Sequence, residues 1–233
     1  MLINLRNALM TGKKWTNPYV TDGLVAMWDG EWNAGGGVHD ANATVWKDLS
    51  GNEYNANINV SSLSVGDNYI EWNPGGSATA VFQNVSQNLS LGCTNSVVVD
   101  IQEHNTSSDF MTIGNHAAGF AIASANRIVG WATLSTRRDY RYIGSLTGKQ
   151  SIDVVFTPYS AKVFVNGAQI TPGGIFWGSS SVNFKRIHLF NTTSGNGRMR
   201  TYRFNTYAKP LTDAEIAANY AIDKARFNLR DAT

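Results

Sequence analysis

The stretch AKVFVNGAQI at residues 161–170 gives the clearest local indication of the fold. Residues 163–165 are β-branched or aromatic, and the pair Asn166-Gly167 follows them directly. Asn-Gly readily adopts the two positive φ angles of a type I′ turn, whose twist matches that of paired antiparallel strands. The stretch therefore predicts a tight hairpin and, with it, an antiparallel sheet.

Short runs that favour β-structure recur along the chain. They lie at residues 96–102, 110–114, 119–124, 128–133, 150–157 and 184–190. Glycine, asparagine, serine and aspartate separate them, and these are the residues that turns require. Short strands at this spacing predict an all-β sandwich or barrel.

One helix is predicted, at about residues 212–227. Thr212 and Glu215 have the spacing of a capping box, in which the threonine hydroxyl accepts the Glu215 N–H and the glutamate side chain reaches back. The apolar residues that follow share one face at helical spacing: Ile216, Ala217, Tyr220 and Phe227. We expect this face to pack on the sandwich.

The composition is that of one sizeable globular domain. Of the 233 residues, 42% are hydrophobic and 11% aromatic, whereas the 15% that are charged are too few for a disordered tail or a coiled coil. The net charge is only +2 and the basic residues are scattered, so no nucleic-acid partner is expected. The single cysteine, Cys93, excludes an internal disulfide bond.

The N-terminal region carries no targeting pattern. No apolar run approaches the ~18 residues that span a bilayer, so membrane insertion is not expected. Residues 1–10 lack the uninterrupted apolar core and the cleavage site of a signal peptide. We expect a protein that is cytoplasmic until lysis, or that leaves by another route, and is then associated with a virion or a surface. Residues 1–21 are interpreted as an N-terminal arm that could join copies into a homo-oligomer, and residues 22–233 as the domain.

Three segments, in order, resemble the laminin G-like jelly rolls of the concanavalin A-like superfamily. They are DGLVAMWDG at 22–30 followed by TVWKDLSGN at 44–52, the hairpin KVFVNG at 162–167, and the ending from YRF at 202–204 through LTDAEIAANY at 211–220. The resemblance implies an antiparallel jelly-roll β-sandwich with a C-terminal α-helix. It also implies glycan binding or adhesion, since members commonly have these roles and some are hydrolases. Residues 1–14 resemble the N-termini of such proteins from gut bacteria and their prophages.

The carboxylates do not form a pattern for glycoside hydrolysis. A retaining glycosidase needs two carboxylates about 5 Å apart, which on a strand requires i, i+2 or i+4 spacing. Asp29 and Glu31 have this spacing but lie at the start of a Gly- and Trp-rich loop without a third acid, and Asp213 and Glu215 belong to the helix cap. No Ser-His-Asp or Cys-His arrangement is legible. We therefore expect a protein that is not an enzyme.

Calcium is the one cofactor that the resemblance suggests. Family members hold the ion near the sandwich rim with an acid from the loop matching residues 48–52 and an acid from the last strand. Asp48 and Asn52 offer hard oxygen ligands, but Arg200 falls where the second acid is expected and would leave the ion without charge compensation. The alternative is that Asp48 and Asn52 make turn hydrogen bonds.

Two groups of residues are candidates for contact with a ligand. Trp32 and Trp177 lie in Gly- and Ser-rich loops, where an exposed indole can stack on a sugar ring; the alternative is core packing. The segment 137–142 contains three arginines and two tyrosines, and on a strand Arg138, Tyr140 and Tyr142 share one face while Arg137, Asp139 and Arg141 share the other. Such a patch could hold an acidic sugar, a carboxylate or a phosphate, or it could be a solvated outer face.

Two non-catalytic functions are compatible with these observations, and a glycoside hydrolase whose carboxylates converge from distant parts of the sequence is a third, less favoured alternative. The leading hypothesis is a non-catalytic carbohydrate-binding or adhesion module whose partner is a glycan or a surface polysaccharide. The alternative is a structural component of a virion or surface that makes only protein–protein contacts.

Overall fold

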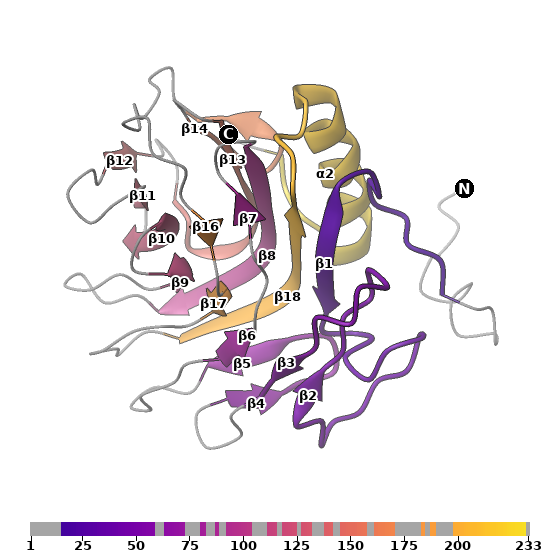
Figure 1. Cartoon of the computed structure of the whole chain (residues 1–233). Coiled ribbons are helices and arrows are strands. Elements are labelled where there is room, and N and C mark those ends of the chain that lie inside the picture. Colours follow the sequence, from indigo (N-terminus) through magenta and orange to yellow (C-terminus); the bar gives the residue numbers. More distant parts are fainter. Residues whose placement is uncertain are drawn as a thin grey trace, which may run out of the picture.

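The computed structural model describes most of the chain, and the described residues are 15–58, 63–72, 80–82, 87–88, 92–103, 111–115, 118–124, 127–131, 138–141, 145–157, 161–170, 183–184, 187–189 and 198–231 (Figure 1). Within them, every strand pair is antiparallel. No helix in this part of the chain is long and apolar enough to cross a membrane.

A large sheet forms the centre of the structure. Its strand order is β15-β14-β13-β8-β18-β5-β4, and β1 also pairs with β18. The strands are β1 (Leu24–Asp29), β4 (Leu63–Val65), β5 (Ile70–Trp72), β8 (Cys93–Glu103), β13 (Gly148–Phe156), β14 (Ala161–Val165), β15 (Ala168–Gln169) and β18 (Arg198–Tyr207).

Shorter strands form three smaller sheets. One has the order β12-β11-β10-β9 and another β17-β6-β3-β2, while β7 pairs with β16. Their bounds are β2 (Val45–Trp46), β3 (Ala56–Asn57), β6 (Ala80–Phe82), β7 (Gln87–Asn88), β9 (Met111–Asn115), β10 (Ala118–Ser124), β11 (Arg127–Trp131), β12 (Arg138–Arg141), β16 (Asn183–Phe184) and β17 (Ile187–Leu189). Strands β9–β12 and the helix α2 (Asp213–Phe227) lie on opposite sides of the large sheet (Figure 1). The predicted fold class, an all-β antiparallel sandwich with a C-terminal helix, is confirmed.

The predicted hairpin connects β14 to β15. Asn166 and Gly167 have φ angles of 49° and 75°, as a type I′ turn requires. The Asn166 side chain ties the turn to β13, because its Oδ1 accepts the Ser151 N–H at 2.9 Å and its Nδ2 donates to Gln150 at 2.7 Å. A Cβ on Gly167 would lie 2.5 Å from the Tyr220 ring, so the helix packs directly on the turn.

Strand β18 changes its partner along one edge. Residues 203–207 pair with β1, and residues 199–201 pair with β5. The register with β8 on the other edge shifts between Thr201 and Arg203, which is the mark of a β-bulge at Tyr202. The Gly30 N–H donates to the Tyr202 carbonyl at 2.8 Å where the exchange takes place. Gly30 must lack a side chain there, because a Cβ would lie 2.5 Å from the Asn68 carbonyl group.

The helix begins with the predicted capping box. The Thr212 hydroxyl accepts the Glu215 N–H at 3.2 Å, and the Glu215 carboxylate accepts the Thr212 N–H at 2.8 Å. Two apolar clusters join α2 and the segment after it to the sheet: Val155, Phe164, Tyr207, Leu211 and Ile216 form one, and Val98, Tyr202, Tyr220, Phe227 and Leu229 form the other.

The buried face of the helix differs from the prediction at three residues. Ala217 is exposed, whereas Ile216, Asn219, Tyr220, Asp223 and Phe227 are buried. The buried stripe therefore includes two polar side chains, which apolar periodicity does not identify.

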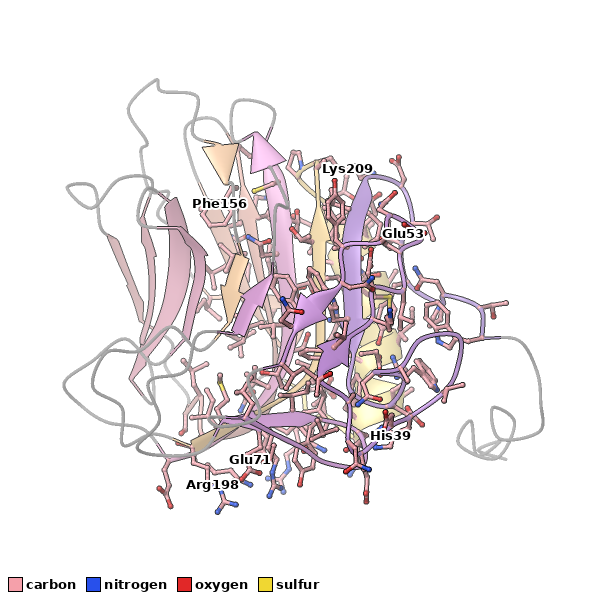
Figure 2. The ribbon with its side chains drawn as sticks, turned by 60° about the horizontal axis from the view of Figure 1, so that its bottom comes forward. His39, Glu53, Glu71, Phe156, Arg198 and Lys209 are labelled. Carbon is pink, nitrogen blue, oxygen red and sulfur yellow. The ribbon has the colours of Figure 1, made fainter. Side chains whose placement is uncertain are left out.

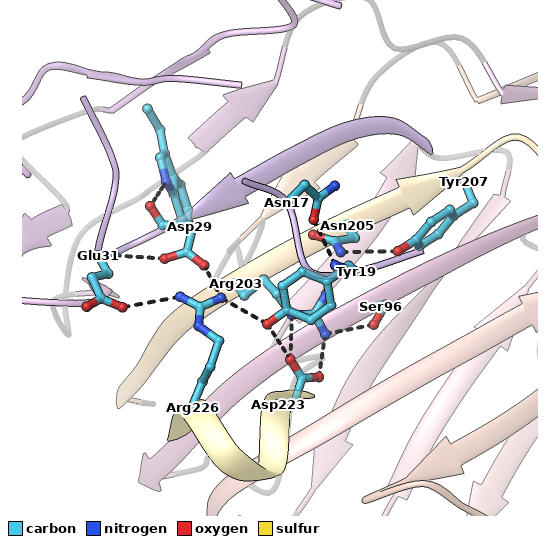
Figure 3. A network of polar contacts seen from close by, with 11 residues as sticks. Asn17, Tyr19, Asp29, Glu31, Ser96, Arg203, Asn205, Tyr207, Asp223 and Arg226 are labelled. Atoms are coloured by element: carbon cyan, nitrogen blue, oxygen red, sulfur yellow. Dashed lines mark hydrogen bonds and ion pairs between the residues drawn. The ribbon is translucent and has the colours of Figure 1, made fainter. Parts of the chain in front are cut away.

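A buried ion pair joins the helix to β18 (Figure 3). Arg203 is fully buried and donates from Nε and Nη2 to the two carboxylate oxygens of Asp223, at 2.8 and 2.6 Å. The Ser151 hydroxyl donates to the same carboxylate at 2.9 Å, and Ser96 accepts a further bond from Arg203 at 2.9 Å. The pair thus connects β8, β13, β18 and α2.

The N-terminal segment completes this network. Tyr19 is only 4% exposed, and its hydroxyl donates to Asp223 at 2.9 Å. The Val20 N–H donates to the Asn219 side chain at 3.0 Å. Residues 15–21 were assigned to the arm by sequence but pack on α2 as part of the sandwich; residues 1–14 lie outside the described residues.

The buried ion pair gives a first prediction. Asp223→Ala leaves the Arg203 guanidinium buried without its partner, and we expect it to lower the free energy of unfolding by about 3–5 kcal/mol. The double variant Arg203→Met/Asp223→Leu removes both charges and should recover most of this loss. Urea unfolding of the single and double variants measures the coupling.

The matched control is the exposed pair between Lys162 and Asp213, whose side chains are 47% and 64% exposed. Lys162→Ala should cost less than about 1 kcal/mol. If Asp223→Ala were as mild as Lys162→Ala, the central role of the buried pair would be refuted.

Candidate ligand-binding face

A row of polar and charged side chains crosses the large sheet on the face that carries α2. The strand register places Ser64 opposite Glu71, Glu71 opposite Arg200, Arg200 opposite Asp100, and Asp100 opposite Lys149. We call these five residues the charged row. From Glu71 to Lys149 acidic and basic groups alternate, so opposite charges face one another across three of the four strand pairs, which stabilises a sheet modestly.

Two tyrosines border the charged row. Tyr69 and Tyr202 meet edge to face, with ring centroids 5.7 Å apart. The Arg200 guanidinium lies 4.5 Å from the centre of the Tyr69 ring, and the Lys149 ammonium 4.4 Å from that of Tyr202. Because Tyr202 also packs against Phe227, the row lies next to the last turn of α2. Two cations are thus held on aromatic faces.

Glu71 binds two arginines of β18. Arg198 donates to its Oε1 from Nε at 2.7 Å, and Arg200 donates to its Oε2 from Nε at 2.5 Å. The Glu71 side chain is 7% exposed, whereas those of Arg198 and Arg200 are 43% and 26% exposed. Glu71 and Arg198 lie together at the lower edge of the molecule in Figure 2. The carboxylate therefore holds the inner edges of the two guanidinium groups, while part of each arginine remains in contact with solvent.

The electrostatics keep Glu71 ionised. Burial raises the pKa of its carboxyl group, but the hydrogen bonds and charges of Arg200 and Arg198 outweigh burial and lower the pKa below its ordinary value. Glu71 and Asp100 balance Arg200 and Lys149, and Glu103 lies opposite Arg198 as the next pair of opposite charges. The face carries no excess of positive charge of the kind that a phosphate backbone attracts.

This arrangement suits a ligand rich in hydroxyl groups. Carboxylates accept hydrogen bonds, and guanidinium and ammonium groups donate them, so the charged row offers both roles side by side. Neighbouring strands lie about 4.8 Å apart, which sets the spacing of the groups along the row. The tyrosine pair adds apolar surface with a polar tip.

The structure contradicts the prediction that Trp32 is an exposed sugar platform. Trp32 is 6% exposed. Its ring centroid lies 5.5 Å from that of Trp15, and the Arg226 guanidinium lies 4.4 Å from the ring centre. The glycine-rich loop turns back on its own backbone after Trp32, with the Gly35 N–H donating to the Trp32 carbonyl at 2.9 Å. Trp32 therefore has the packing role that was its alternative.

The arginine–tyrosine patch is described only in its backbone. Arg138 and Tyr140 lie on β12, where the register places them opposite Gly130 and Ile128 of β11. Residues 138–141 of the segment form a strand. Arg137, Tyr142 and Trp177 lie outside the described residues, so ligand contact by the patch stays a prediction.

The residues of the charged row were not predicted from the sequence as ligand contacts. Arg198, Arg200 and Tyr202 repeat, at i, i+2 and i+4, the residue types that had drawn attention to the arginine–tyrosine patch. This spacing alone could have indicated a second candidate patch for ligand contact on one face of a strand. Glu71 and Lys149 could not have been added to it, because only the register of β5, β18, β8 and β13 brings them together.

Asp48 makes turn hydrogen bonds in the structure. Its carboxylate accepts the backbone N–H groups of Met27, Ser50 and Tyr54 at 2.9, 2.9 and 3.0 Å, and the Ser50 hydroxyl at 2.7 Å. The Asn52 amide donates to the Val25 carbonyl at 2.8 Å. These contacts are the alternative that was weighed against calcium ligation, and among the described residues no three His, Cys, Asp or Glu side chains gather as metal ligands do.

Arg200 does not lie beside the Asp48 turn, contrary to the expectation from the sequence. Asn205 is the β18 residue opposite Met27, whose N–H binds Asp48. Arg200 lies further along the strand, opposite Glu71. Arg200 therefore bears on the charged row and not on the Asp48 turn.

The carboxylates that have catalytic spacing are engaged in ion pairs. Asp29 is fully buried and lies 2.8 Å from Nη1 of Arg226, and Glu31 lies 3.2 Å from Nη2 of the same guanidinium. Asp213 pairs with Lys162, and Glu215 pairs with Lys209 beside the helix cap. Asp29 and Glu31 thus attach the end of β1 and the loop after it to α2, and Asp213 and Glu215 hold the first turn of α2.

The fold is similar to that of toxin binding domains and sialidases. The ligand binding domain of botulinum neurotoxin serotype D, in complex with N-acetylneuraminic acid, has a TM-score of 0.65 and 15% identity over 87% of this chain and 51% of that chain. For the binding domain of Paraclostridial Mosquitocidal Protein 1 the TM-score is 0.61, with 16% identity over 86% and 52%. For Trypanosoma rangeli sialidase in complex with sialic acid it is 0.65, with 17% identity over 94% and 37%.

The chain has the jelly-roll-like β-sandwich fold of these proteins. No protein-family model and no curated protein sequence matches it. The chain spans about half the length of the toxin domains and little more than a third of the sialidase. At these identities the likeness establishes the fold alone.

The Asp48 turn gives a second prediction. Asp48→Ala removes the acceptor of four hydrogen bonds, and we expect it to lower the free energy of unfolding by about 2 kcal/mol or more. Because these bonds need no ion, the loss should be equal in excess calcium and in excess chelator, as measured by thermal unfolding. A wild-type Tm that rises with calcium, in a way that Asp48→Ala abolishes, would restore the metal site.

Proposed function

We propose that the chain is a non-catalytic carbohydrate-binding module and that the charged row, with Arg198, Tyr69 and Tyr202, is its ligand-binding face. The observation that carries the proposal is the pair of partly exposed arginines that Glu71 fixes beside two aromatic rings. Side chains held in place before binding lose less conformational freedom when a ligand arrives.

The structural neighbours support a carbohydrate as the ligand. The botulinum neurotoxin domain is in complex with N-acetylneuraminic acid, and the sialidase is in complex with sialic acid. These ligands belong to those proteins, and the similar fold makes a glycan the first class to test here. The three ordered segments that resemble laminin G-like domains favour the same class, and with it display on a virion or a cell surface.

Five of the described carboxyl groups are placed in ways that support binding without hydrolysis. Asp29 and Glu31 share Arg226, Glu71 is held by two arginines, and Asp48 by four hydrogen bonds. A general acid needs a carboxyl group that can be protonated and can reach the substrate. Asp153 is the described carboxyl whose pKa is raised, to about 7, but only 1% of its surface is exposed.

The structural-component hypothesis makes a different prediction about the N-terminus. Tyr19 and Val20 are already bonded within the same chain, to Asp223 and Asn219. An assembly contact through the arm would therefore have to use residues 1–14. Deletion of residues 1–14, and not of 1–21, is the variant that tests it without breaking the sandwich.

The third prediction concerns glycan binding. On an array that includes neutral and sialylated glycans, we expect a specific signal for the wild type. Arg200→Gln removes charged hydrogen bonds worth about 1.5–3 kcal/mol, so affinity should fall about 10- to 100-fold. Glu71→Gln keeps both arginines but weakens their anchor and should give a smaller loss.

Lys162→Ala is the matched control, since it removes a partly exposed cation from the helix-bearing face outside the charged row. It should leave the signal unchanged. A glycan signal that survives both Arg200→Gln and Lys149→Gln would place the site elsewhere. The absence of any signal, together with an oligomer that dissociates when residues 1–14 are deleted, would favour the structural component.

A further inference from the structure

Asp153 lies in the middle of β13, directly beneath α2. The flanking residues on the same face both contact the helix: the Ser151 hydroxyl donates to Asp223, and Val155 packs with Ile216. Because side chains alternate along a strand, Asp153 also faces α2, between these two contacts. It is 1% exposed.

The surroundings of Asp153 are partly apolar and offer its carboxylate little support. The register places Ser96 of β8 on one side of it and Phe164 of β14 on the other. Among the described residues, neither carboxylate oxygen receives a hydrogen bond of ordinary geometry. The Ser96 hydroxyl is the group best placed to favour the ionised form. An ionised carboxylate buried in this way is costly.

The charged and titratable groups near Asp153 are already committed to one another. On β18, Arg203 directs its hydrogen bonds to Asp223 and Ser96, and the Tyr207 hydroxyl accepts the Asn219 amide at 3.1 Å. On α2, Asp223 is a second negative charge. Tyr19 of the N-terminal segment is bonded to Asp223 as well. Ionised Asp153 would therefore add a charge to a network in which Arg203 and Asp223 already balance.

We infer that Asp153 is a proton-binding site beneath α2, and that loss of this proton loosens the docking of α2 and residues 15–21 on the sheet. This inference is independent of the proposed glycan face. It rests on the burial of the carboxyl group, on the absence of a hydrogen bond of ordinary geometry to it from the described residues, and on its position within the helix–sheet contact.

The direction of the pKa agrees with this geometry. Burial raises the pKa of Asp153 from 3.8 to about 7; the neighbouring Ser96 hydroxyl and the Arg203 charge offset part of the effect, and the Asp223 charge adds to it. The folded state therefore holds the proton more tightly than the unfolded state does. The contribution of Asp153 to the free energy of unfolding is largest below about pH 4. It falls as the pH rises to about 7 and stays low above that value. The difference of about 3 pH units corresponds to roughly a thousandfold change in the unfolding equilibrium constant.

Comparison with Asp153→Asn isolates this group, because asparagine has nearly the same shape and does not titrate. The ratio of the unfolding constants of wild type and Asp153→Asn is measured by urea denaturation between pH 4 and 8.5. We expect the ratio to rise by two to three orders of magnitude across that range and to level off above about pH 7.

Asp100→Asn is the control, since it removes a partly exposed carboxylate from the same face of the sheet. A general effect of charge would change both ratios alike. A ratio for Asp153→Asn that is flat from pH 5 to 8.5 would overturn the inference.

A measurement on the wild-type protein guards against a variant that folds poorly. Carbon-13 NMR of the aspartate carboxyl groups, with the Asp153 signal assigned by its loss in Asp153→Asn, should show that signal titrating near neutral pH. Hydrogen exchange of the α2 amides, corrected for the intrinsic rate, should accelerate between pH 6 and 8 in the wild type and not in Asp153→Asn. A carboxyl signal that titrates near pH 4 would refute the proton site, and equal acceleration in both proteins would refute its link to the helix.

Discussion

The ion pair between Arg203 and Asp223 is the contact on which the rest of the domain depends. It is buried on both sides, and through Ser96, Ser151 and Tyr19 it reaches two further strands and the N-terminal segment. Burying such a pair is expensive, and an apolar pair can often replace it without loss of stability. The bidentate bond between Arg203 and Asp223 fixes one position of α2 along β18. An apolar pair would not fix this position.

The bulge at Tyr202 divides β18 into two parts with different surroundings. Residues 203–207 lie under α2 and pair with β1, whereas residues 199–201 pair with β5, and both Arg198 and Arg200 in this part of the strand bind Glu71. Tyr202 belongs to both parts, since it packs on Phe227 and also borders Lys149. The contact of helix with sheet and the candidate ligand face are therefore adjacent and share one residue.

Local patterns predicted the hairpin at Asn166-Gly167 and the capping box at Thr212, because both depend on residues close in sequence. Sequence periodicity failed where burial depends on distant partners. Asn219 and Asp223 are buried only because Val20, Tyr19 and Arg203 bind them, and Trp32 is buried only because Trp15 and Arg226 cover it. The charged row likewise needs the register of strands far apart in sequence, although the alternation at Arg198, Arg200 and Tyr202 was visible in advance.

The central position of β18 has a consequence for how the chain is made. Strands β1, β5 and β8 all pair with β18, yet each is synthesised long before it. A nascent chain on the ribosome therefore presents unpaired strand edges, which are prone to association with other chains, until β18 has emerged. The sheet closes late and through contacts between segments distant in sequence, and such a topology folds slowly.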